Sequence, residues 1–291
     1  MAIIVALCAF IVPSAKEKTD SLHVLFIGNS YTFFNDMYVT VSRIAAENPA
    51  HRLAIAYKNL TPGGCSFARH LTLNDEIDVI KKGGWDYVVM QEQSSAPSLP
   101  SEIVAKNTYR NAHLLDSIVH KYNPKAQVIF YMTWGHKFGT QNPTEGYPLP
   151  DTYEGMQMRL INSYLEMAYQ NNAWCAPVGM AWQQMRRERP YVPIYNADAS
   201  HPSAIGSYLA ANVIYATILQ KPYTSNYIAD IDPELAEYIQ QLAQNTVLNN
   251  LRLLNIVKYC HACWLLLLDV IVVNLYSEYY CAACRCNHVC D

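Results

Sequence analysis

The chain has 291 residues, enough for one α/β domain with appendages, and its 21 Lys and Arg against 24 Asp and Glu give a formal net charge of −3. No run of basic residues forms the positive stripe that nucleic-acid binding requires, so we expect no nucleic-acid partner. The 22 tyrosines suit a groove for a polar, ring-shaped ligand, because each combines an apolar ring with a hydroxyl group.

The N-terminus is an apolar run over residues 1–15 that ends in small residues before the polar segment 16–20. This run has the length of a secretion signal and is too short to cross a membrane as a helix. Its usual positively charged start is missing, and the residues before Cys8 fit a lipoprotein cleavage site poorly. We expect residues 1–20 to be a signal peptide and leader, and the protein to be exported to the periplasm, cell surface or medium without a stable membrane span.

Short apolar runs alternate with helical patterns along the rest of the chain. The predicted strands are 22–27, 53–57, 85–91, 126–133 and a weaker one at 174–178. The predicted helices are 37–47, 75–82, 102–122, 153–171, 202–219 and 233–254. Because such alternation gives a mostly parallel sheet covered on both faces, we predict an α/β domain over residues 21–255, a three-layer α/β/α sandwich with about five strands. Ligands of these sheets bind at the carboxyl ends of the strands.

Ser30 stands at that edge, because it follows the first predicted strand in the turn Gly28-Asn29-Ser30. A serine in such a turn is by itself an ordinary turn residue, and its hydroxyl needs a base before it can act as a nucleophile. Asp198 and His201 supply a base, since a carboxylate three residues away can fix the imidazole tautomer while the other ring nitrogen faces the serine. Standing alone, these two residues would be a helix cap and a surface histidine.

Ester hydrolysis also requires hydrogen-bond donors for the oxyanion. Gly64 can present its backbone N–H without a side chain in the way, and Gln91 and Gln93 place carboxamide donors after the third predicted strand. Each of these residues also fits a plain turn.

Taken in order, four segments resemble the blocks of the SGNH (GDSL-like) hydrolase superfamily over about residues 22–220: 26–32 (FIGNSYT), 63–64 (GG), 91–94 (QEQS) and 198–202 (DASHP). Together with 133–135 (TWG) and 177–182 (PVGMAW), they are similar to a branch of bacterial SGNH proteins common in gut Bacteroidetes. The resemblance implies a flavodoxin-like fold without metal or organic cofactor. It also implies Ser30 as nucleophile, His201 as general base and Asp198 as its orienting partner.

The family's oxyanion hole would be formed by the backbone N–H groups of Ser30 and Gly64 and by a side chain of the third block. Two departures from the family pattern stand out: Asn29 replaces the more usual Asp, and a Gln replaces the usual oxyanion Asn. Gln93 aligns best with that Asn, and Gln91 is the alternative. If neither reaches the oxyanion, the site loses a donor.

These features predict a secreted serine esterase that hydrolyses carboxylic esters, with O-acetyl groups on carbohydrates as the suggested substrate. The competing hypothesis is a carbohydrate-binding protein on the same scaffold with little or no turnover. Four side chains predicted near the strand ends are candidates for contact with a sugar: Trp134, His136, Tyr153 and Trp182.

From residue 256 to residue 291 the composition changes to a Cys-rich, apolar tail. The spacing of Cys260, Cys263, Cys281 and Cys284 matches a zinc ribbon. The apolar stretch 264–275 between the pairs is unlike the polar loops of small zinc modules. We therefore expect a tail foreign to the domain, such as a read-through or frameshifted end, and no metal site.

Overall fold

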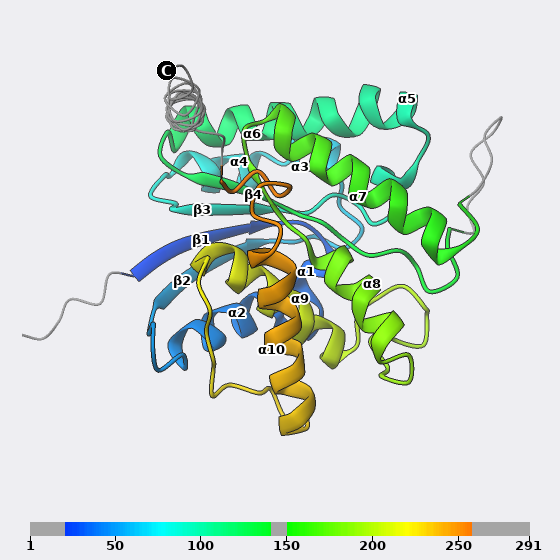
Figure 1. Cartoon of the computed structure of the whole chain (residues 1–291). Coiled ribbons are helices and arrows are strands. Elements are labelled where there is room, and N and C mark those ends of the chain that lie inside the picture. Colours follow the sequence, from blue (N-terminus) through cyan, green and yellow to red (C-terminus); the bar gives the residue numbers. More distant parts are fainter. Residues whose placement is uncertain (1–20, 141–149, 258–291) are drawn as a thin grey trace, which may run out of the picture.

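The computed structural model describes residues 21–140 and 150–257, and it contains one sheet of five parallel strands in the order β2-β1-β3-β4-β5 (Figure 1). The strands are β1 (Ser21–Ile27), β2 (Ala54–Leu60), β3 (Tyr87–Met90), β4 (Gln127–Tyr131) and β5 (Trp174–Ala176). The expected leader 1–20 and the four cysteines with zinc-ribbon spacing lie outside the described residues, so the leader and the foreign tail remain predictions.

Helices cover both faces of this sheet, which gives the predicted three-layer α/β/α sandwich (Figure 1). On one face lie α2 (Met37–Ala46), α9 (Ala204–Leu219) and α10 (Pro233–Leu248). On the other lie α4 (Asn74–Lys81), α6 (Arg110–Tyr122) and α7 (Tyr153–Gln170). A short helix, α5 (Ser101–Ile103), and a π-helical segment at Val104–Tyr109 lead directly into α6.

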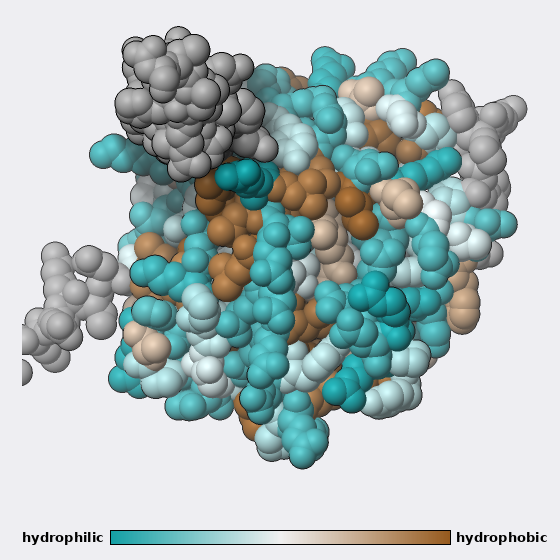
Figure 2. All heavy atoms as spheres, viewed as in Figure 1, coloured by the Kyte–Doolittle hydropathy of each residue, from teal (hydrophilic) through white to brown (hydrophobic). Residues whose placement is uncertain are grey.

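The burial of these elements explains why their apolar patterns could be recognised in the sequence. Val24, Leu25, Phe26 and Ile27 of the central strand β1 are at most 1% exposed, because neighbouring strands and both helical layers enclose them. Helix α9 is buried along most of its length between α2, α8 (Val178–Glu188) and α10, so it is apolar on all sides. Helix α10 is amphipathic instead, and Figure 2 shows polar side chains along its outer surface with apolar ones on either side.

The strand order places a topological switch point between β1 and β3. The chain leaves β1 toward β2 on one side and returns to β3 on the other, so the connections after β1 and β3 diverge at the carboxyl ends of the strands. Sheets of this order bind ligands in the crevice outside that point. Ser30 follows β1 there, so the fold itself brings this residue to the expected position.

Three helices were not predicted. Ser30 does not lie in a loop but begins the one-turn helix α1 (Ser30–Phe33), and the four-residue helix α3 (Phe67–His70) follows the Gly63-Gly64 turn. Such short helices contain too few residues to show an apolar period. Helix α8 (Val178–Glu188) follows β5 directly, with Pro177 at its N-cap position. The proline that weakened the strand prediction therefore marks the start of this helix.

Cys65 and Cys175, the two cysteines of the described residues, are both free and buried. No helix in residues 21–140 or 150–257 is long and apolar enough to span a bilayer. In the same residues, no group of three or more His, Cys, Asp or Glu side chains is arranged to hold a metal ion.

Candidate active site

Ser30, His201 and Asp198 form a continuous chain of hydrogen bonds at the carboxyl edge of the sheet. Ser30 Oγ lies 2.8 Å from His201 Nε2, and His201 Nδ1 lies 2.6 Å from Asp198 Oδ2. The three predicted residues therefore meet, although 171 positions separate the serine from the histidine. With Nδ1 donating its proton to the carboxylate, Nε2 is left to accept the proton of the serine hydroxyl.

Asp198 is held in its ionised form by the turn that it begins. Partial burial alone would raise its pKa, but hydrogen bonds from the backbone N–H of Ser200, the His201 ring and the His201 N–H outweigh that effect. Its pKa is lowered as a result, although the side chain is about half exposed. One oxygen, Oδ1, accepts the two backbone N–H groups at 3.0 and 2.9 Å, and the other faces the imidazole.

The imidazole is also fixed by aromatic rings. Phe34 stacks on the His201 ring at 4.4 Å between centroids, and Tyr31 meets it edge-on at 5.5 Å. Ser200 holds the turn that carries His201. Its hydroxyl lies 2.7 Å from the Tyr31 hydroxyl, and its carbonyl accepts the Trp134 indole N–H at 3.0 Å. These contacts restrict the ring to the orientation that faces Ser30.

The turn before Ser30 is tied down by Asn29. Its Oδ1 caps α1 by accepting the Tyr31 N–H, and its Nδ2 donates to the carbonyl of Cys65 at 2.9 Å. This residue is the departure from the usual Asp noted above, and here its amide joins the turn of Ser30 to the loop of Gly64. A side chain at Gly28 would place Cβ only 2.5 Å from Thr32 Oγ1, so this close turn requires glycine.

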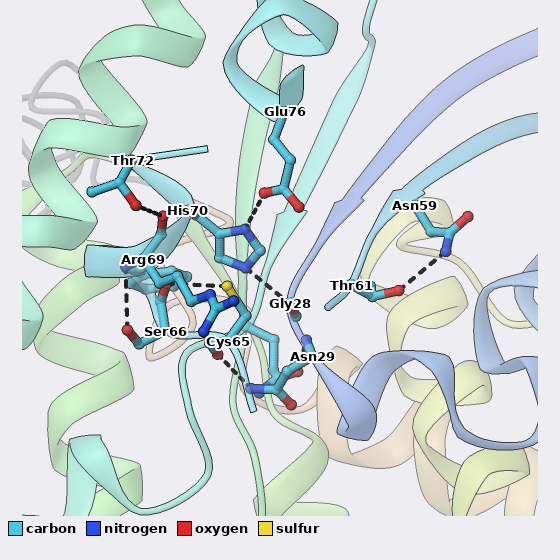
Figure 3. A network of polar contacts seen from close by, with 12 residues as sticks. Gly28, Asn29, Asn59, Thr61, Cys65, Ser66, Arg69, His70, Thr72 and Glu76 are labelled. Atoms are coloured by element: carbon cyan, nitrogen blue, oxygen red, sulfur yellow. Dashed lines mark hydrogen bonds and ion pairs between the residues drawn. The ribbon is translucent and has the colours of Figure 1, made fainter. Parts of the chain in front are cut away.

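A buried histidine supports the same turn through the carbonyl of Gly28 (Figure 3). His70 is 1% exposed, and its Nε2 donates to the carbonyl of Gly28 at 2.9 Å, while its Nδ1 contacts Glu76 Oε2. The carbonyl can only accept, so the proton on Nε2 is required by the geometry. The sequence gives no signal for this pair, because six positions separate His70 from Glu76 and no known motif has that spacing.

Three groups remain candidate oxyanion donors, as the sequence suggested. Among the described residues, neither the N–H of Ser30 nor that of Gly64 is used in a hydrogen bond, and Gly64 is exposed with a φ of +63°. Gln93 is half-buried, and its Oε1 accepts the N–H groups of Ser95 and Ala96, which turns its NH₂ group outward with only a 3.4 Å contact to the Ser94 hydroxyl.

Gln91 occupies a different environment and is a structural residue. It is fully buried, its Oε1 accepts the Asn29 N–H at 3.1 Å and the Thr32 hydroxyl at 2.9 Å, and its Nε2 donates to the carbonyl of Glu92. Its side-chain oxygen therefore holds the turn before Ser30, while its NH₂ group is engaged with the carbonyl of its neighbour Glu92. Of the two glutamines that the sequence left open, Gln93 is the one with a donor to spare.

The prediction that Trp134, Trp182 and Tyr153 contact a sugar is wrong, because all three are core residues. Trp134 and Trp182 are 0% exposed and stack on each other at 3.9 Å, and Tyr153 is 4% exposed. Trp134 follows β4 and Tyr153 begins α7, as expected for residues at element ends, whereas Trp182 lies inside α8, which was not predicted. Nothing in the local pattern showed that the layers close over these residues. His136 is half-buried, and its pKa is lowered by burial and by the nearby charge of His201.

Glu92, two positions before Ser94, is 2% exposed and has no cationic partner among the described residues. Burial raises its pKa from 4.5 to about 7, against the opposing effect of hydrogen bonds from the Gln93 and Phe67 N–H groups. Its buried position and its two accepted N–H groups make Glu92 a hydrogen-bond anchor, not a charge at the rim of the site.

A carboxyl group whose pKa is raised on folding stabilises the fold fully below its unfolded pKa and loses that contribution as the pH rises through the folded value. For Glu92 that window runs from pH 4.5 to about pH 7, and the raised pKa corresponds to roughly 3 kcal/mol. We therefore expect the free energy of unfolding of Glu92→Gln, relative to that of the wild type, to rise by roughly 2–3 kcal/mol from pH 5 to pH 8. Urea unfolding at both pH values measures this gain, and a constant difference between the two proteins would refute it.

The parallel sheet of order 2-1-3-4-5 with this hydrogen-bonded trio at its switch point defines the SGNH hydrolase fold. Solved structures with this fold superimpose on the chain: a DUF4886 family protein from Bacteroides uniformis has a TM-score of 0.60 and 18% identity, and covers 79% of this chain and 95% of its own. A protein from Slackia heliotrinireducens assigned to the SGNH hydrolases has a TM-score of 0.55 and 24% identity, over 68% of this chain and 100% of its own.

The acetylxylan esterase Axe2 from Geobacillus stearothermophilus has a TM-score of 0.50 and 17% identity, and covers 68% of this chain and 94% of its own. No protein-family model and no curated protein matches the sequence. The predicted fold, which is that of the SGNH hydrolases, is thus confirmed.

Proposed function

We propose that the protein is a serine esterase in which Ser30 attacks the carbonyl carbon of a carboxylic ester. The observation that carries this proposal is the hydrogen-bond chain from Ser30 Oγ through the His201 ring to Asp198, with distances of 2.8 and 2.6 Å. A serine hydroxyl is a weak nucleophile unless an adjacent base removes its proton, and this arrangement provides that base together with its orienting carboxylate.

In the proposed reaction, Ser30 Oγ bonds to the carbonyl carbon while its proton passes to His201 Nε2. The resulting oxyanion is stabilised by the N–H groups of Ser30 and Gly64 and by the NH₂ group of Gln93. The ester C–O bond then breaks, the leaving alcohol takes the proton from His201, and an acyl group remains on Ser30. Water activated by His201 releases that acyl group as a carboxylic acid. No step requires a metal or an organic cofactor.

We place O-acetyl groups on carbohydrates first among the substrates. A surface cavity of about 300 Å³ beside the turn of His201 supports this choice, because cationic and tyrosine side chains that can bond and stack on a sugar line it, among them Lys137, Arg186, Tyr191 and Tyr195. The cavity borders the turn directly, since the Lys137 N–H donates to the carbonyl of Ala199 at 2.8 Å. The shared fold of an acetylxylan esterase agrees with the same substrate class. Export through residues 1–20 completes the proposal of a secreted esterase.

Hydrolysis of p-nitrophenyl acetate and of acetylated xylo-oligosaccharides by the full chain tests this function. We expect turnover of both, and we expect a fluorophosphonate probe to modify Ser30, as located by peptide mass spectrometry. Turnover of the aryl ester alone would support the esterase assignment and contradict the proposed carbohydrate substrate. An inert protein whose Ser30 the probe leaves unmodified would instead favour the competing hypothesis of a carbohydrate-binding protein without turnover.

A further inference from the structure

Glu92 joins the two loops that carry the candidate oxyanion donors outside the turn of Ser30. A single oxygen, Oε1, accepts the Gln93 N–H at 2.6 Å and the Phe67 N–H at 3.0 Å. Gln93 is itself a candidate donor, and Phe67 begins α3, three residues after Gly64. One carboxylate oxygen therefore joins the segment after β3 directly to the loop of Gly64.

The loop of Gly64 has few other attachments. Gly63 and Gly64 are exposed, and a Cβ on either would meet nothing within 4 Å. The Cys65 N–H closes the turn by donating to the carbonyl of Pro62 at 3.2 Å. Two contacts just after Gly64 tie this turn to the rest of the site, because the Asn29 amide donates to the Cys65 carbonyl and Glu92 accepts the Phe67 N–H. The position of the exposed Gly64 N–H therefore depends in part on Glu92.

The environment of Glu92 argues that the carboxylate is more than a filler of space. Tyr164 of α7 contacts its backbone N–H through the hydroxyl, and the side chain has no exit to solvent. An apolar side chain here would leave the Gln93 and Phe67 N–H groups without this acceptor, so the oxygen of Glu92 has a specific role.

We propose that Glu92 is a positioning residue of the oxyanion hole, which fixes the Gly64 N–H and the Gln93 side chain at one spacing by bridging their loops. This inference rests on the proposed esterase function. The role depends on reach: the side chain must be long enough for one oxygen to meet both N–H groups, and an uncharged oxygen of the same reach can serve. A shorter carboxylate keeps the charge but cannot meet both.

The matched variants are Glu92→Gln, which keeps the length, and Glu92→Asp, which keeps the charge. Because a misplaced oxyanion donor weakens only the transition state, we expect Glu92→Asp to lose about tenfold or more in kcat per folded protein, with KM changed less than about threefold. Glu92→Gln should retain kcat within about threefold. Glu234→Gln, the same chemical change at an exposed position of α10, serves as the control.

Amide hydrogen exchange of Phe67 and Gln93, followed by NMR, reports the bridge independently of activity. We expect both amides to exchange about tenfold faster or more in Glu92→Asp and unchanged in Glu92→Gln. If Glu92→Asp keeps its kcat, or loses it without faster exchange at both amides, the proposal is overturned. A wild type without Ser30-dependent hydrolysis would end the proposed function, and the exchange comparison would still decide whether Glu92 joins the two loops.

Discussion

Replacing Ser30 with alanine is expected to lower kcat for p-nitrophenyl acetate by about 10⁵-fold, the scale seen when a triad nucleophile is removed. His201→Ala should cost a similar amount, because the hydroxyl has no other base within hydrogen-bond distance among the described residues. Since the two side chains act as one unit, the double variant should be no slower than either single variant. Steady-state hydrolysis of the three proteins, corrected for the spontaneous reaction, measures all three values.

Ser101→Ala provides a matched serine control, because Ser101 is an exposed residue at the start of α5. This variant should keep the wild-type kcat. Additive losses in the double variant would show that Ser30 and His201 act independently, which contradicts the proposed proton transfer. Equal activity in wild type and Ser30→Ala would remove the nucleophile assignment altogether.

The fold was predictable where burial forces a simple pattern. Strands β1 and β4 are enclosed on both faces, so their apolar runs stand out against the polar turns that follow. The order of strands along the chain then implied the layers. What the sequence could not provide was the pairing order that puts the switch point after β1, since the same elements fit several sheet orders.

The candidate site was predictable only as a set of separate segments. Ser30 and the pair Asp198 and His201 were found because each stands in a recognisable block, and the structure brings them together. The roles of Gln91 and Gln93 could not be separated from the sequence, because both follow the same strand and stand two positions apart, a spacing that puts both side chains on one side of an extended chain. The strand ends at Met90, so the direction of each following side chain depends on tertiary contacts such as the one between Gln91 and Asn29.

Aromatic residues near the site were misread for a related reason. Trp134 follows the carboxyl end of β4, and this position favours a role in ligand contact. Helix α8, however, supplies Trp182, which stacks on the Trp134 ring. Because α8 was not predicted, the layer that covers Trp134 was missing from the sequence-based picture. The polar edge of the same ring still serves the site, since its N–H holds the carbonyl of Ser200.

The two glutamines can be separated by making the same substitution at each. Gln93→Glu keeps the side-chain length and the oxygen that accepts the Ser95 and Ala96 N–H groups, but it replaces the NH₂ donor with a negative oxygen beside the developing oxyanion. We expect kcat to fall by about 10²–10³-fold with little change in KM, the loss typical of a removed oxyanion donor.

Gln91→Glu should behave differently, because the Gln91 amide faces the interior and donates to the Glu92 carbonyl. Losing that donor in a buried site should lower the free energy of unfolding by about 1–3 kcal/mol, while kcat per folded protein changes less than about tenfold. Urea unfolding and ester hydrolysis of both variants distinguish the two roles. The opposite pattern would assign the donor to Gln91, and full activity in both variants would leave the oxyanion to the backbone N–H groups of Ser30 and Gly64 alone.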